Sequence, residues 1–196
     1  VQVQTAQAIS KAEISKTARS VTVMIQDPQN PGSGVIIKRE GQTYTVLTAQ
    51  HVVKSSTDFT VMTPDDKKHP MTQGSIQTFP HVDLALIKFT SADTYSVAKI
   101  GDSAQSPSGT ASFVAGFPGK TEVRSEPNYY FTSGEIAANA NKPLKDGYAI
   151  AYNNPTLPGM SGGPVLNEKG ELIGIHGRAE STPVPQNAQI REDIYV

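Results

Sequence analysis

A serine set among glycines is the residue of this sequence best suited to nucleophilic chemistry. Ser161 lies in the run Gly159-Met160-Ser161-Gly162-Gly163. Hydrolysis of an amide by acyl transfer needs a hydroxyl nucleophile and N–H donors for the developing oxyanion, and glycines let the backbone turn tightly enough to supply them. Ser161 is therefore the candidate nucleophile, with the amides of Gly159 and Ser161 as candidate oxyanion donors. Taken alone, the motif fits a simple glycine-rich turn equally well.

Two further residues supply the base and the carboxylate that such a nucleophile requires. His51 lies in the segment 48–53, which directly follows a predicted strand over residues 44–47, and Asp83 opens the apolar run at residues 84–87. A buried carboxylate without a partner is costly, so Asp83 either caps a turn or binds a group such as an imidazole N–H. Each residue alone fits an ordinary structural role. Their joint occurrence with Ser161 predicts a His-Asp-Ser catalytic triad.

The segments that must position these residues are predicted to be short β-strands joined by turns. Runs of β-branched and aromatic residues between Gly and Pro favour strands at residues 20–25, 35–37, 44–47, 59–62, 84–87, 112–115, 129–131, 148–151, 164–166 and 172–175. Strands do not alternate with helices, which favours an all-β fold. Residues 5–18, with Ile9, Ile14 and Ala18 at near-helical spacing, predict one short N-terminal helix.

Composition excludes several classes of function. The chain has 196 residues, of which 37% are hydrophobic, and 17 Lys and Arg against 18 Asp and Glu give a net charge of -1. Without runs of like charge, neither nucleic acid nor a membrane surface is expected as a partner. The absence of cysteine excludes disulfides, a Cys-based zinc site and a thiol nucleophile. No metal or other cofactor is expected. Without a long apolar segment or a signal-peptide pattern, we expect a soluble, already processed chain.

The combined motifs resemble those of chymotrypsin-like serine proteases, specifically the disulfide-free bacterial group that includes glutamyl endopeptidases and HtrA-type proteases. T-A-x-H-V at residues 48–52, D-L-A-L at 83–86 and G-x-S-G-G-P at 159–164 carry the resemblance, together with a glycine-bearing strand at 32–37. It covers most of residues 20–179. It implies two perpendicular six-stranded antiparallel β-barrels with the triad in the cleft between them.

This resemblance sets expectations for the parts of the molecule. Residues 1–18 would form an N-terminal helical segment, residues 19–100 the first barrel and residues 101–196 the second. His51 would take the proton of Ser161 and return it to the leaving amine, while Asp83 holds the imidazole in one tautomer. Met160 departs from the pattern of zymogen-activated trypsins, which have an aspartate immediately before the serine. Other contacts must therefore hold the oxyanion loop.

The resemblance also suggests a specificity. Trypsin-type enzymes carry an aspartate six residues before the serine, where this chain has Pro155. Thr156 and His176 match the positions at which glutamyl endopeptidases bind a substrate carboxylate, which implies cleavage after Glu and less often Asp. The strand after the serine adds Gly177 and Arg178 to the pocket wall.

Other specificities remain open at this point. Thr156 and His176 would also fit a pocket for small apolar residues, and Glu180 could favour a basic one. Glutamyl endopeptidases recruit their N-terminal amine as well, a role that would fall to Val1.

Other functions are also open. An α/β-hydrolase esterase would need a helix after Ser161, where a strand is predicted. A catalytically silent, protease-like binding module would not need the intact triad.

The remaining expectations concern metals, partners and location. The acidic pair at residues 65–66 could bind calcium, but two lysines follow it and a solvated turn is the simpler interpretation. His69 and His81 are interpreted as structural or surface residues. The expected partners are protein or peptide substrates of a monomeric enzyme. The bacterial group resembled here implies a secreted or periplasmic mature form.

Overall fold

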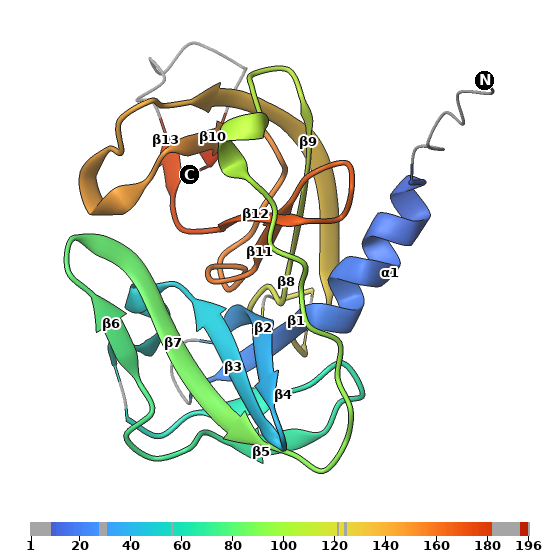
Figure 1. Cartoon of the computed structure of the whole chain (residues 1–196), viewed down its shortest axis with the longest axis vertical. Helices are drawn as coiled ribbons and strands as arrows, with labels where there is room; N and C mark the ends of the chain where they lie inside the picture. Colours follow the sequence, from blue (N-terminus) through green and yellow to red (C-terminus); the bar gives the residue numbers. More distant parts are fainter. Residues whose placement is uncertain are drawn as a thin grey trace, which may run out of the picture.

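Two antiparallel β-sheets, one from each half of the chain, make up most of the structure (Figure 1). The computed structural model describes residues 9–27, 31–55, 57–120, 122–123, 125–181 and 193–195, with side chains up to residue 179. In Figure 1 the first sheet occupies the lower half of the molecule and the second sheet the upper half. The sequence-based prediction of an all-β fold with two antiparallel sheets and one helix is confirmed.

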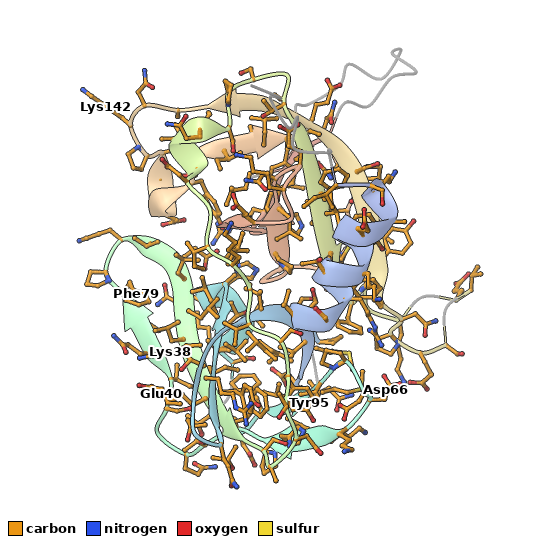
Figure 2. All side chains as sticks on the ribbon, turned by 45° about the vertical axis from the view of Figure 1, so that its right-hand side comes forward. Lys38, Glu40, Asp66, Phe79, Tyr95 and Lys142 are labelled. Carbon is orange, nitrogen blue, oxygen red and sulfur yellow. The ribbon has the colours of Figure 1, made fainter. Side chains whose placement is uncertain are left out.

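The first sheet contains seven strands, in the order β5-β4-β1-β2-β3-β7-β6. Their bounds are β1 Thr22–Gln26, β2 Gly32–Glu40, β3 Thr43–Thr48, β4 Thr60–Met62, β5 Lys68–Pro70, β6 Gln77–Phe79 and β7 Val82–Thr90. Side chains on β7 alternate, so that Asp83, Ala85, Ile87 and Phe89 are buried. The inner end of β2 is buried, whereas Lys38 and Glu40, labelled in Figure 2, form an exposed ion pair of 3.0 Å.

The second sheet also contains seven strands, in the order β12-β11-β8-β9-β10-β14-β13. Their bounds are β8 Ala111–Gly116, β9 Tyr130–Asn139, β10 Ile150–Tyr152, β11 Pro164–Leu166, β12 Leu172–Ile175, β13 Ala179–Ser181 and β14 Asp193–Tyr195. Three 3-10 helices, η1 Gln50–Val53, η2 Ser103–Gln105 and η3 Lys145–Gly147, lie in the connections. Strands of this sheet contribute Val114, Ile136 and Tyr152 to one buried apolar cluster.

In the described residues, each sheet has seven strands, whereas the resemblance to chymotrypsin-like proteases implied six per barrel. The unpredicted strands are β5 and β6 in the first sheet and β13 and β14 in the second. Both β5 and β6 are three-residue strands whose residues are exposed or half-buried. Because they lack an alternation of buried apolar residues, nothing in their sequence distinguishes them from loops. The proposed division of the chain into residues 1–18, 19–100 and 101–196 stays a prediction.

The helix α1, Lys11–Val21, begins and ends later than predicted. Ser10 and Glu13 form a capping box that sets its first turn. Ile14, Ala18 and Val21 continue the helical spacing past residue 18 and are buried, so the strand predicted from residue 20 starts at Thr22. The apolar face of α1 packs in one cluster with residues of both sheets. Within the described residues, no helix is long and apolar enough to span a membrane.

Candidate active site

His51 and Asp83 lie together at one end of two paired strands. Thr48, the last residue of β3, faces Ala85 of β7 in the antiparallel register, so the chain after Thr48 continues beside the first residues of β7, among them Asp83. His51 follows in η1, and its Nδ1 lies 2.6 Å from Asp83 Oδ2. The backbone N–H of His51 donates to Asp83 Oδ1 at 2.9 Å. Both carboxylate oxygens are therefore bound to one histidine.

A third donor to Asp83 comes from the other half of the chain. The hydroxyl of Tyr148, between η3 and β10, donates to Asp83 Oδ2 at 2.5 Å. Burial of Asp83 acts to raise its pKa, but the hydrogen bonds from His51 and Tyr148 outweigh it and hold the pKa of this carboxyl well below its ordinary value. Asp83 is therefore ionised at neutral pH. From the sequence, Tyr148 is predicted only as a strand residue, and no local signal marks its contact with Asp83.

The loop that carries Ser161 depends on glycines for its shape. Gly159 and Gly162 have φ angles of +98° and +87°, which disfavour residues with side chains. A Cβ atom on Gly162 would lie 2.0 Å from the carbonyl oxygen of Ser33 in the first sheet. The hydroxyl of Ser161 donates to the carbonyl of Gly177 at 3.1 Å.

His51 and Ser161 line the same pocket, although in the described residues no hydrogen bond joins them. The backbone amides of Gly159 and Ser161 likewise donate to no group in the described part of the chain. They are thus available to a bound oxygen. Rotation about one side-chain bond would release the Ser161 hydroxyl from the carbonyl of Gly177 and free it for another partner in this pocket.

The four predicted specificity residues, Thr156, His176, Gly177 and Arg178, lie in this same pocket of about 680 Å³. His176 is only 4% exposed, and the hydroxyl of Tyr152 lies 2.6 Å from its Nδ1. Burial, with a smaller contribution from His51, lowers the pKa of His176 to about 4. The imidazole is therefore neutral at neutral pH. No local pattern in the sequence marks Tyr152 as the partner of this histidine.

Comparison with known proteins identifies the family. The sequence model of the trypsin-like peptidase domain matches residues 32–175. The chain belongs to this family. Its relatives include a probable periplasmic serine endoprotease DegP-like of Marinomonas sp., 32% identical over 149 residues, and one of Hahella chejuensis, 30% identical over 155 residues. A putative serine protease HhoA of Synechocystis sp. is 32% identical over 157 residues.

These alignments cover only part of the relatives. They include 75 to 78% of this chain but only 29, 30 and 38% of the three relatives. The trypsin-like peptidase domain described here thus spans about a third of the length of the proteins it matches. The expected membership in the chymotrypsin-like proteases is confirmed at the level of this domain.

The remaining charged candidates of this peptidase domain have local partners. Arg178 lies 3.9 Å from Asp146, and this carboxylate partly offsets the positive charge that Arg178 brings to the pocket. Asp65 accepts a hydrogen bond from Thr63 and pairs with Lys67. In the part of the chain that the structure describes, no cluster of His, Asp and Glu could hold a metal ion. Val1 and the side chain of Glu180 lie outside the described residues.

Proposed function

We propose that this chain is the catalytic domain of a serine endopeptidase, with His51, Asp83 and Ser161 as its triad. The observation that supports this most strongly is the pair of hydrogen bonds from His51 to the ionised Asp83, in a pocket that His51 shares with Ser161. A carboxylate bound to Nδ1 leaves the other ring nitrogen free to act as a base. Membership in the trypsin-like peptidase family supports the same assignment.

In the proposed mechanism, a substrate carbonyl enters the pocket and Ser161 turns from Gly177 toward His51. His51 takes the hydroxyl proton as the serine oxygen attacks the carbonyl carbon. The amides of Gly159 and Ser161 donate to the oxyanion of the tetrahedral intermediate. His51 then returns the proton to the leaving amine, and water hydrolyses the acyl-enzyme by the same steps. Asp83 stays ionised throughout and stabilises the imidazolium.

We further propose that the enzyme prefers Glu, and less often Asp, before the cleaved bond. In this arrangement Tyr152 donates to Nδ1 of His176, so that the ring proton sits on Nε2 as a donor for a substrate carboxylate. The hydroxyl of Thr156 supplies a second donor in the same pocket. A bound carboxylate would in turn favour the charged imidazole, which strengthens the interaction. Small apolar or basic residues at this position are the alternative.

Chromogenic peptides with Glu, Asp, Arg or Leu before the scissile bond test both parts of the proposal. The wild-type protein is expected to cleave the Glu peptide fastest, and Ser161→Ala is expected to lose about 10⁶-fold in kcat. Equal rates for the two proteins would remove the catalytic claim and favour a binding module. A clear preference for Arg or Leu would refute the roles of Thr156 and His176 but leave the triad intact.

Location and assembly are part of the same proposal. The DegP-like relatives are named as probable periplasmic enzymes. We infer that this domain acts on protein or peptide substrates outside the cytoplasm and functions as a monomer. Cell fractionation and light scattering of the purified protein test these two points. A cytoplasmic location or a stable oligomer would contradict them.

A further inference from the structure

The loop that carries the oxyanion donors is tied to the first sheet through a single buried residue. Ser33 lies near the start of β2 and has no exposed surface. Its hydroxyl donates to the carbonyl of Gly159 at 2.9 Å and accepts the backbone N–H of Phe117 at 2.8 Å. Gly159 and Phe117 both belong to the second half of the chain. The hydroxyl thus joins two segments of that half from across the cleft.

The backbone of Ser33 binds the same loop. Its N–H donates to the carbonyl of Ser161 at 2.8 Å, so Ser33 holds the carbonyls on both sides of Met160. Its own carbonyl accepts the hydroxyl of Thr48 at 2.7 Å, and Thr48 ends the strand that leads to His51. Ser33 therefore connects the segment of the candidate base to the segment of the candidate nucleophile.

Gly159 is the point at which this loop most needs support. A glycine at a φ of +98° has no Cβ to restrict it, so the peptide planes on either side can rotate at low cost. The plane before Gly159 is held because the carbonyl of Pro158 accepts the N–H of Gly119 at 2.9 Å. In a trans peptide the C=O and N–H point in opposite directions, so this bond aims the Gly159 N–H away from Gly119.

The plane after Gly159 is held by two hydrogen bonds: the hydroxyl of Ser33 donates to the Gly159 carbonyl at 2.9 Å, and the N–H of Met160 donates to the carbonyl of Leu157 at 3.1 Å. Met160 is fully buried and uncharged, so its side chain cannot anchor the loop through an ion pair. Among the described residues, the Ser33 hydroxyl is the group that binds the Gly159 carbonyl. Loss of that bond would leave this plane with only the Met160 N–H bond to Leu157, at the opposite edge from the carbonyl, and would loosen the backbone of Gly159 on this side.

We propose that Ser33 is a positioning residue whose hydroxyl helps to hold the Gly159 and Ser161 amides in the orientation needed to bind an oxyanion. The proposal rests on the serine endopeptidase function proposed above. In this proposal a residue of the first sheet supports the oxyanion site, although both of its N–H donors lie in the loop between β10 and β11 in the second half of the chain. Ser33 itself touches no reacting atom in this scheme.

Ser33→Ala tests the proposal. Removal of an oxyanion donor lowers kcat about 10²- to 10³-fold, and a donor that is only misplaced part of the time should cost less. We expect kcat to fall about 10- to 100-fold, with KM changed less than about threefold, because the ground-state carbonyl needs these donors less than the oxyanion does. A peptide aldehyde, which forms a tetrahedral adduct, should lose affinity by the same factor as kcat/KM. The cleaved product peptide should not.

Thr22→Val is the matched control. The Thr22 hydroxyl is also fully buried and donates to the carbonyl of Ala18 at 2.6 Å, at the end of α1 and outside the pocket. Its loss should lower Tm about as much as Ser33→Ala does, without changing kcat. Ser33→Thr keeps the hydroxyl and should recover most of the activity. Ser33→Cys keeps the volume but offers a weak donor, and it replaces the alanine variant if that variant does not fold.

The outcomes separate this proposal from the function it rests on. If the wild-type protein and Ser161→Ala hydrolyse peptides equally, the endopeptidase function fails. If the wild-type enzyme is active and folded Ser33→Ala, or folded Ser33→Cys, keeps kcat within twofold, only the role of Ser33 is overturned. An equal loss of kcat in Thr22→Val would also overturn it, because the effect would then follow from lowered stability.

Discussion

His51 and His176 line one pocket but lie in opposite surroundings. The side chain of His51 is 32% exposed, and its Nδ1 faces the ionised carboxylate of Asp83. His176 is 4% exposed, and its Nδ1 faces the hydroxyl of Tyr152 at the same distance of 2.6 Å. The two rings thus differ in the charge of the Nδ1 partner and in access to water, although the Nδ1 distance is the same.

This difference explains how one side-chain type can serve two roles in one site. A carboxylate beside the ring stabilises the imidazolium that forms when His51 accepts a proton. A phenol offers no such charge, and burial penalises the imidazolium, so the pKa of His176 falls to about 4. In the proposed mechanism, the carboxylate partner therefore suits His51 to act as a base, whereas burial beside a phenol keeps His176 a neutral hydrogen-bonding group. Exchanging or removing the partners should break this distinction.

The largest effect is expected from Asp83→Asn. An amide in this position can donate to Nδ1 and so favour the tautomer in which Nε2 already carries a proton. In a Ser-His-Asp triad this change lowers kcat about 10⁴-fold while leaving the geometry intact. Steady-state kinetics on the preferred peptide measure it. Asp146→Asn, which removes a half-exposed carboxylate near Arg178, is the control and should change kcat little. A loss of less than tenfold for Asp83→Asn would refute the assigned role.

The next largest effect is expected on specificity from His176→Gln. The amide can still bind the Tyr152 hydroxyl but cannot become charged when a substrate carboxylate enters. Charge-assisted hydrogen bonds contribute about 1.5–3 kcal/mol, so the preference for Glu over Gln before the cleaved bond should fall about 10- to 100-fold. Paired kcat/KM values measure the ratio. An unchanged ratio would show that His176 does not read the substrate carboxylate.

The same variant should change how stability depends on pH. The folded pKa of His176 is about 4, below the unfolded value near 6.5. Between these values the unfolded chain binds more protons, so the free energy of unfolding decreases as the pH falls. This linkage should cost about 2 kcal/mol between pH 7 and pH 4.5. Urea unfolding should show the loss in the wild type and in His69→Gln but not in His176→Gln. Equal losses in all three would contradict a buried neutral His176.

The sequence predicted the parts of this site that depend on local patterns. Residues that closely follow a strand, such as His51, and glycines with close backbone contacts, such as Gly162, leave a signal in their immediate neighbours. The fold class followed from alternating apolar runs in the same way. The partners from the opposite sheet leave no such signal. Tyr148 and Ser33 act on residues 65 and 126 positions away, so only the packing of the two sheets reveals their contacts.

The short strands were missed for a related reason. Strands β5 and β6 pair through backbone groups, and their side chains are mostly exposed. Backbone pairing needs no particular side chains, whereas sequence patterns report only which side chains are buried. The start of α1 was predicted too early for a different reason. The capping box of Ser10 and Glu13, which sets the start at Lys11, is a local sequence signal, but a prediction from apolar spacing alone does not use it.

The smallest effect is expected from Tyr148→Phe, which removes one hydrogen bond to Asp83 and leaves Asp83 as the partner of His51. Asp83 would lose one of three donors, and its pKa would rise toward the ordinary value near 3.9 yet remain far below neutrality. The carboxylate therefore stays ionised, and kcat should fall only about three- to tenfold, which corresponds to one hydrogen bond of about 1 kcal/mol. The ring, which fills the space beside Gly177, remains in place.

Tyr95→Phe is the matched control, because it removes a tyrosine hydroxyl that binds His69 and Thr63 within the first sheet, outside the pocket. The depressed pKa of Asp83 contributes stability that is fully present above pH 4 and is lost as the pH falls through the lower folded value. Tyr148→Phe should remove part of this contribution at neutral pH and little of it in strong acid. A kcat loss as large as that of Asp83→Asn would mean that the tyrosine hydroxyl, and not the charge alone, makes His51 a base.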